Sequence, residues 1–514
     1  MGAGAASNRW WTAAAAAAVL LALALRLWGL AWGAPFVYHP DEHFILHRAL
    51  DIVRERDLNP HWFQYPTLPI YLEALLVLAL QPIVYAPLTT NSIINGIGPW
   101  DALPEQWPFV LAGRVAVALS GVAGVALLFA GGRRWHSGGA GAAAALLLAV
   151  MPLHLESSHY LTTDVPAVAL IAATIWVSLR ADSASAPAAE PVLRWLVAGL
   201  CAGFAAATKY TAGFVLLVPV LLASDLRRPR ASARRLFYIA AGALGAFLLA
   251  CPYSLIDLAG FLRGLEEQQQ NYLTDSTPGR AWYWYAVQLW SYELQPGAAA
   301  AALVGAGFAV HRARRADVAL LLPPLIYYAV VALFPSRPER NLIPLLPFAC
   351  LFAGRALAEV CYRLFSPRLA SAAIAVVALS VALPPARQAL RANAERARPD
   401  TRSLAHQWVS TNVPEGSCLA REEYTPQLPA TRYQVHYLWS LAQRPYSWYL
   451  EQKCDYLVAS SNIYGRVHGP PYFGGPTAAE FYRVLFSLPR VAEFNPGPSA
   501  SGPTIRIFKL PRGQ

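Results

Sequence analysis

The chain has 514 residues, of which 56% are hydrophobic and 14% are charged. A soluble globular protein carries about 25% charged residues, so this composition excludes an ordinary soluble domain. The net charge of +11 comes mainly from arginine and could indicate a nucleic-acid partner, but the arginines cluster in connections between long apolar runs. These features predict an all-α polytopic membrane protein with no nucleic-acid partner.

Apolar runs recur along the first three quarters of the chain. A helix needs about 20 apolar residues to cross the hydrocarbon core of a bilayer, and fewer where protein shelters it. Eleven segments fit this requirement: 10–32, 107–130, 138–155, 164–180, 194–208, 211–224, 235–254, 296–311, 318–334, 341–360 and 369–386. The first is too long for a signal-peptide core and lacks a convincing cleavage site, so we expect it to remain as a span.

The placement of arginine predicts how these helices are oriented, because basic loops stay on the cytoplasmic side. Arginines occur in alternate connections, at 133–134, 180–194, 227–235, 312–315 and 363–368, and Arg9 precedes the first span. We therefore predict a multi-pass membrane protein with its N-terminus in the cytoplasm and its C-terminus outside.

One apolar stretch, 65–88, does not fit this scheme. Counting it as a span would invert every later loop, and it contains Glu73 and several prolines. We interpret it as a re-entrant or interfacial helix on the outer face.

The sequence changes character near residue 389. Residues 1–388 form the predicted transmembrane domain, with a first outer loop at 33–106. Beyond them, short apolar runs such as "DYLVASS" and "TIRIFKL" alternate with turns and with "AAEFYRVLFSL", which predicts a small outer α/β domain at 389–514. Cys418 and Cys454 lie in this domain, and the sequence leaves undecided whether they form a disulfide. The cysteines show no spacing typical of a zinc site.

Polar residues gather in the loops predicted to face outward. "YHPDEHF" (38–44) follows the first span, and "HLESSHYLTTDVP" (154–166), "TKYT" (208–211) and "FPSRPERNLIP" (334–344) reach the same face. Polar groups at the ends of spans are costly and commonly functional. The sequence therefore predicts a site at the outer membrane surface.

The residue types in these loops suit one kind of chemistry. Transfer of a sugar from a lipid phosphate needs one base for the acceptor hydroxyl and cations for the phosphate, which leaves as a stable anion. A sugar hydrolase would instead need two facing carboxylates. Asp41 is the candidate base, and Glu42 would orient it or hold a substrate hydroxyl. The candidate phosphate ligands are Lys209, Arg337 and Arg340.

These motifs resemble the GT-C glycosyltransferases, in particular protein O-mannosyltransferases and the aminoarabinose transferases that modify lipid A. "HPDEHF" resembles the first-loop acidic motif, "FQYPTLPIYL" the proline-rich juxtamembrane helix, "HYLTTDVP" the Thr-Asp motif, "AATKYTAGFVLLVP" the lysine turn, and "RPERNLIPLLPFACLFAG" the late arginine-rich motif. The remaining substrate-binding candidates come from these motifs: His39, His43, Tyr65, His159, Asp164 and Tyr210.

The resemblance implies an inverting transfer from a polyprenyl-phosphate sugar to an acceptor lipid, glycan or protein on the outer face of a bacterial inner membrane, with Asp41 as base. It implies no cofactor, and a divalent metal ion is kept as an alternative. Two departures leave donor and acceptor undefined. Gln64 stands where the aminoarabinose branch usually has a lysine, and Asn341 follows Arg340 where a tyrosine is often found.

Simpler interpretations compete with these roles. Asp41 and Glu42 suit the first turn of a helix, and so does Asp164 beside Pro166. His39, His43 and His47 recur at spacing four and could hold a metal on one helix face. Lys209, Arg337 and Arg340 could serve as anchors at the membrane interface. The aromatic stretch 280–294 could belong to an aromatic belt.

The rival function is a multi-pass transporter or a ligand-binding membrane protein with an outer domain. A transporter would place acidic groups near the middle of the membrane, whereas the acidic residues of this chain gather at one predicted face. A sensor or scaffold would leave the Asp-Glu and Thr-Asp motifs without a role.

Overall fold

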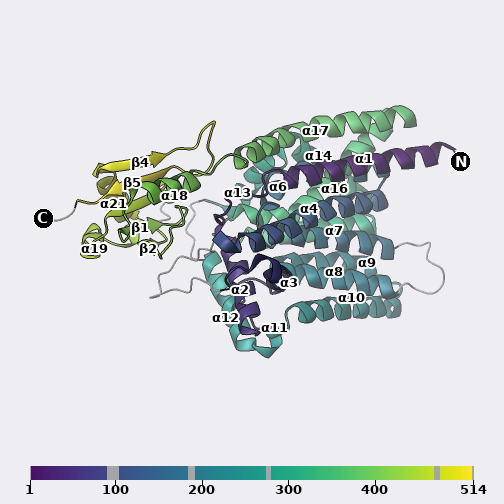
Figure 1. Cartoon of the computed structure of the whole chain (residues 1–514). Coiled ribbons are helices and arrows are strands. Elements are labelled where there is room, and N and C mark those ends of the chain that lie inside the picture. The colour runs from purple at the N-terminus through teal and green to yellow at the C-terminus, as the bar shows by residue number, and fades with distance from the viewer. Residues whose placement is uncertain (1, 89–103, 183–191, 274–278, 468–474, 512–514) are drawn as a thin grey trace.

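The computed structural model describes residues 2–88, 104–182, 192–273, 279–467 and 475–511. It consists of a helical bundle with a small α/β domain at one end (Figure 1). Residues 89–103, the end of the predicted first loop, lie outside the described residues.

The helices of the bundle run side by side (Figure 1). They are α1 (Gly2–Leu27), α4 (Trp107–Trp135), α5 (Gly138–Val150), α7 (Asp164–Ala181), α8 (Val192–Thr208), α9 (Leu217–Ala223), α10 (Pro229–Ala250), α14 (Gln295–Arg312), α15 (Arg315–Val331), α16 (Leu346–Leu364) and α17 (Pro367–Arg396). Each predicted apolar segment overlaps one of these helices, and the predicted all-α polytopic fold with a small C-terminal α/β domain is confirmed.

The predicted number of eleven spans is not confirmed. Six described helices are long and apolar enough to cross a membrane by length and composition, or seven if the bent pair Ala281–Glu293 and Gln295–Arg312 forms one span. The other segments form shorter helices, and some of them are divided by breaks in the chain. Residues 194–224, for example, divide at Lys209 into α8, the 3₁₀ helix η2 (Tyr210–Leu216) and α9.

Small residues let some of these helices pack backbone to backbone. A Cβ atom added at Gly203 in α8 would lie only 2.2 Å from the carbonyl oxygen of Ala243 in α10, and one at Gly199 would meet the carbonyl of Ile239 at the same distance. Helices in lipid associate through such close approaches rather than through hydrophobic burial. The contact fixes α8, and with it the turn that carries Lys209.

Shorter helices cover the end of the bundle next to the C-terminal domain (Figure 1). They are α2 (Pro40–Glu55), α3 (Leu68–Val84), α6 (Pro152–Ser157), α11 (Tyr253–Ile256), α12 (Leu258–Leu273), α13 (Ala281–Gln288) and the 3₁₀ helix η4 (Glu339–Leu345). The predicted re-entrant segment forms α3, which packs on α2. We refer to this end as the site end of the bundle.

The C-terminal domain holds a five-stranded sheet in the order β2-β1-β3-β5-β4. Its strands are β1 (Cys418–Glu422), β2 (Gln434–Leu438), β3 (Tyr456–Ser460), β4 (Arg490–Phe494) and β5 (Ile505–Lys509), and its helices are α18 (Thr401–Asn412), α19 (Tyr446–Glu451), α20 (Ser461–Val467) and α21 (Gly475–Ser487). Strands β2, β1 and β3 are parallel, whereas β5 is antiparallel to β3 and to β4.

The C-terminal domain forms hydrogen bonds with the segment that precedes α2. The side chain of Gln427 donates to the carbonyl of Val37 at 2.7 Å, and Arg402 donates to the carbonyl of Tyr38 at 3.2 Å. The hydroxyl of Tyr38 lies 3.0 Å from that of Ser403. The start of α2 is therefore held between the bundle and the domain.

Candidate active site

Asp41 stands in the first turn of α2, at the site end of the bundle. The ring of His39 caps this helix, because its Nδ1 accepts a hydrogen bond from the backbone N–H of Asp41 at 3.3 Å, and Pro40 occupies the first helical position, where no N–H is required. Burial and the guanidinium groups of Arg340 and Arg114 lower the pKa of His39 to about 3, so its ring is neutral and can accept. The cap is thus His39, and the carboxylate of Asp41 remains available to the site.

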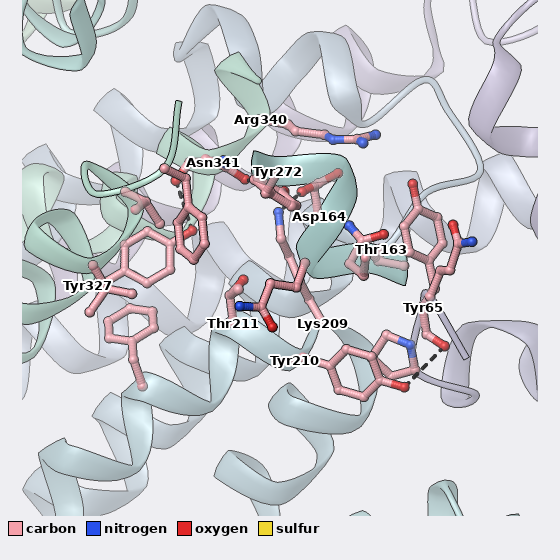
Figure 2. Close-up of a pocket in the computed structure, with 18 of the residues that line it drawn as sticks. Tyr65, Thr163, Asp164, Lys209, Tyr210, Thr211, Tyr272, Tyr327, Arg340 and Asn341 are labelled. Carbon is pink, nitrogen blue, oxygen red and sulfur yellow. Dashed lines mark hydrogen bonds and ion pairs between the residues drawn. The ribbon is translucent and has the colours of Figure 1, made fainter. Parts of the chain in front are cut away.

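Two ion pairs meet in this region. Arg340 in η4 pairs with Asp41, and Lys209 pairs with Asp164, the first residue of α7. Figure 2 shows Lys209 pointing toward Asp164, with Arg340 beside them. The two carboxylates and Lys209 are mostly buried, whereas the side chain of Arg340 is 35% exposed. Four segments far apart in the sequence therefore bring two acids and two cations together.

An apolar groove of about 430 Å³ opens beside these pairs (Figure 2). Its walls are mostly aromatic and aliphatic, and they include Tyr65, Tyr210, Phe214, Ile326, Tyr327, Val330, Val331 and Phe334. Lys209 and Arg340 also line it. The groove thus combines an apolar wall with two cations, which is the combination that a phosphate on a hydrocarbon chain requires.

A polar chamber of about 1230 Å³ lies between the bundle and the C-terminal domain. The bundle contributes His39, His43, Glu156, Tyr160 and Trp284, and residues following strands of the C-terminal domain complete it. Four residues line both the chamber and the apolar groove: Asp41, Thr162, Asp164 and Arg340. Asp41 therefore lies where the two cavities meet.

Glu42 has a different environment from its neighbour Asp41. Its side chain is fully buried and forms a two-pronged ion pair with Arg114 of α4, with both N···O distances 2.7 Å. It also accepts from the backbone N–H of Leu161 at 2.8 Å. Glu42 lines neither cavity. The structure places it as a link between α2, α4 and the segment before α7 rather than as a group that faces a substrate.

The other predicted site residues divide among the two cavities. Tyr65, Lys209 and Tyr210 line the groove, whereas His39, His43 and Arg337 line the chamber. His159 lines neither. Its ring is buried and its two nitrogens lie 2.9 and 3.0 Å from the carbonyl oxygens of Leu155 and Trp28, which indicates a structural role.

Sequence reasoning missed several residues of the site. Arg114 is absent from the predicted site, although it lies within the predicted span 107–130, where a charged residue commonly indicates a functional or structural role. Tyr272 and Asn341 line the groove and are hydrogen-bonded to each other at 3.2 Å. No charged motif in the sequence marks Tyr272, which lies in α12.

The histidines at spacing four, His39, His43 and His47, do not make up a group of three potential metal ligands among the described residues. His43 Nε2 lies 3.1 Å from the carbonyl of Val37, and the Nδ1 of His39 is engaged as a cap. The group of three potential ligands found among the described residues is Cys418, His436 and Cys454, in the C-terminal domain.

The fold and the site describe a membrane-embedded protein whose cavities converge on a carboxylate, and comparisons with known proteins show what it is similar to. A family model described as dolichyl-phosphate-mannose-protein mannosyltransferase matches residues 110–256. No curated protein sequence matches the chain.

Solved structures match nearly the whole chain. One is ArnT from Cupriavidus metallidurans bound to undecaprenyl phosphate, with a TM-score of 0.56, 14% identity, and coverage of 97% of this chain and 98% of that one. Another is the Archaeoglobus fulgidus oligosaccharyltransferase in its apo form, with a TM-score of 0.56, 12% identity, and coverage of 89% and 70%. The same archaeal enzyme in complex with an inhibitory peptide and a dolichol-phosphate matches with a TM-score of 0.54 at 11% identity, covering 88% and 70%.

The chain therefore has the GT-C fold, and its resemblance to protein O-mannosyltransferases and to ArnT is confirmed. At these identities the solved structures establish the fold and leave the substrates of this chain to be argued from its own site.

Proposed function

We propose that the chain is an inverting glycosyltransferase that moves a sugar from a polyprenyl-phosphate carrier to an acceptor on the outer face of a bacterial inner membrane. The observation that carries this proposal is the position of Asp41, at the junction of an apolar groove and a polar chamber. A lipid-linked donor and a water-soluble acceptor group need two cavities of these different characters.

The donor would occupy the apolar groove. Its hydrocarbon chain would lie along the aromatic and aliphatic wall, and its phosphate would be placed by Lys209 and Arg340, which both line the groove. The structures of ArnT and of the archaeal oligosaccharyltransferase hold undecaprenyl phosphate and dolichol-phosphate, which supports a carrier of this class. Arginine and lysine together would neutralise the phosphate as it leaves.

The acceptor would enter through the polar chamber. Asp41 would take the proton of its hydroxyl while the oxygen attacks the anomeric carbon and the carrier phosphate departs on the opposite side, which inverts that carbon. Arg340 contacts Asp41 and lines both cavities, so it can stabilise the base before transfer and the phosphate after it. Glu42 would act as a positioning residue, because it fixes the turn that carries Asp41.

No step of this reaction is routed through a metal ion, since lysine and arginine supply the positive charge. We therefore propose that turnover persists in the presence of a chelator.

Asp41→Asn tests the function directly, because it keeps the size of the side chain and removes the base. We expect turnover to fall by about 10²–10⁴, the usual contribution of a general base, while binding of a polyprenyl phosphate is nearly unchanged. Transfer can be measured with purified protein, a panel of polyprenyl-phosphate sugars and membrane extracts as acceptor source. Near-normal turnover by Asp41→Asn would reduce the residue to a part of the helix start.

A further inference from the structure

The wall of the polar chamber that belongs to the C-terminal domain is built from one edge of its sheet. Strands β2, β1 and β3 are parallel neighbours, so their carboxyl ends lie at the same edge. In open α/β sheets, ligands bind outside this edge. Five of the domain's chamber residues stand at or just beyond these strand ends: Glu423, Tyr424, Tyr437, Trp439 and Asn462. Arg466, on helix α20 after β3, also lines the chamber.

This edge is held rigidly by a buried carboxylate. Glu422, the last residue of β1, is fully buried and accepts hydrogen bonds from the backbone N–H of Ser460 at 2.7 Å and of Leu441 at 3.0 Å. It therefore ties the end of β1 to the end of β3 and to the segment after β2. A surface fixed in this way loses little conformational entropy when it binds a ligand.

The chemistry of the edge suits a saccharide. The rings of Tyr424 and Trp439 lie 6.2 Å apart in an edge-to-face arrangement, and Trp439 is 36% exposed. An aromatic face carries negative charge density and attracts the polarised C–H groups of a sugar ring. Glu423 and Asn462 can accept and donate hydrogen bonds to sugar hydroxyls. The bundle adds further aromatic side chains to the chamber, among them Trp284 and Tyr160.

The charges of the chamber argue against a strongly anionic acceptor. Five carboxylates line it, contributed by Asp41, Glu156, Asp164, Glu339 and Glu423, against four guanidinium groups from Arg337, Arg340, Arg402 and Arg466. Asp164 is paired with Lys209 and Asp41 with Arg340, so the chamber is close to neutral and offers no excess of cations to a phosphorylated lipid headgroup. A volume of about 1230 Å³ exceeds that of a usual small-ligand pocket, so the chamber has room for more than one sugar unit.

We infer that the acceptor is a neutral or weakly charged oligosaccharide, which the carboxyl edge of the C-terminal sheet binds through Trp439 and Tyr424 and presents to Asp41. This inference rests on the proposed function, and it adds the class of acceptor and the residues that recognise it.

Binding of glycans to the full-length protein tests the inference without requiring turnover. The purified protein in detergent is applied to an array of neutral and charged oligosaccharides, together with serine- and threonine-containing peptides and a phosphorylated glycolipid. Wild type and Asp41→Asn should both retain neutral oligosaccharides. Trp439→Ala should weaken this binding by about tenfold or more, and Trp439→Phe should restore part of it. Trp448→Ala is the matched control, since Trp448 belongs to the same domain, packs against His436 and does not line the chamber.

The outcomes separate the two proposals. Glycan binding that depends on Trp439, in a protein that transfers no sugar, would leave the glycan site on the C-terminal domain standing and overturn the proposed function, and with it the role of the glycan as acceptor. Transfer that depends on Asp41 but goes to a peptide or to the phosphorylated glycolipid, with no glycan retained, would overturn the inference and leave the function standing. Equal glycan binding by wild type and Trp439→Ala would also overturn it, provided that both variants show the same thermal unfolding.

Discussion

Two consecutive acids in this chain occupy opposite environments. Successive residues of a helix are rotated by about 100° from one another, so neighbours in sequence do not share a face. Asp41 faces both cavities, whereas Glu42 turns inward to the guanidinium of Arg114. The ring faces of Trp32 and Trp107 cover that guanidinium at 4.9 and 4.8 Å. Two residues with the same functional group therefore lead to different expectations on mutation.

Glu42→Gln should reduce the stability of the protein. It leaves Arg114 charged and buried without its partner, and breaking a buried ion pair costs about 3–5 kcal/mol. Thermal or denaturant unfolding of the purified variant should show this loss. Asp41→Asn should cost much less, because Arg340, the partner of Asp41, is 35% exposed and stays solvated. A Glu42→Gln protein as stable as wild type that loses only turnover would make Glu42 a reacting group instead.

Lys209→Ala and Arg340→Ala should each weaken binding of the carrier phosphate. Loss of one charged hydrogen bond corresponds to about 1.5–3 kcal/mol. Titration of a polyprenyl phosphate into purified protein measures this affinity. Arg466→Ala is a suitable control because Arg466 lines the chamber and not the groove. Unchanged affinity in both of the first two variants would leave Lys209 and Arg340 as interfacial anchors.

The sequence allowed part of this site to be predicted. Asp41, Lys209 and Arg340 could be chosen because charged residues at the ends of apolar segments are uncommon, and the structure brings them together. The ion pairs that they form could not be predicted, since these depend on how η4 packs near α2 and how the turn after α8 packs near α7. The inward position of Glu42 was also hidden, because its partner Arg114 lies 72 residues away.

At the scale of elements, apolar length predicted where helices occur better than where they end. The break at Lys209 divides one apolar region into α8, η2 and α9, and the sequence scheme had already placed a turn there. By contrast, α17 continues to Arg396, beyond the predicted domain boundary at 388, so the boundary between the two domains stays a prediction. The parallel arrangement of β2, β1 and β3 could not be predicted, because strand order depends on contacts between distant segments.

The sheet also brings together the two cysteines of the C-terminal domain. Cys418 begins β1, and Cys454 lies two residues before the neighbouring β3. Both are buried, and their Sγ atoms lie 3.1 Å apart. We expect them to form a disulfide if the domain faces an oxidising compartment, with a disulfide oxidoreductase accepting the two hydrogens and electrons of the thiols. By the chain-entropy estimate, closing this loop of about 37 residues would stabilise the domain by about 4 kcal/mol.

Thiol counting checks this expectation. Alkylation in denaturant without reductant should modify four of the six cysteines, and reduction should expose the other two. Cys418→Ser should leave a reactive Cys454 and lower the unfolding temperature, whereas Cys350→Ser in the bundle should not change the number of thiols that appear on reduction. Six reactive thiols before reduction, or one bound metal ion per chain that is lost in His436→Ala, would contradict a disulfide.

At the scale of the whole molecule, the C-terminal domain and the start of α2 form one unit. The domain is hydrogen-bonded to the backbone of Val37 and Tyr38, only a few residues before Asp41. Asp41, the candidate base, therefore lines the chamber between the domain and the bundle. An acceptor bound to the domain would be positioned against Asp41 by the same contacts, so the arrangement requires both parts to lie on one side of the membrane.

The direction of the bundle in the membrane follows from the arginine-rich connections. We expect positions 133, 228 and 314 to face the cytoplasm and positions 60, 275 and 450 to face outward; position 275 lies outside the described residues. Single cysteines introduced at these positions, in a variant without the native ones, can be labelled in intact cells with a reagent that does not cross the membrane. Outward positions should react at once, and the others only after the cells are opened. Basic loops favour this direction. Labelling of position 133 from outside would mean that 65–88 crosses the membrane, because one additional span inverts every later loop.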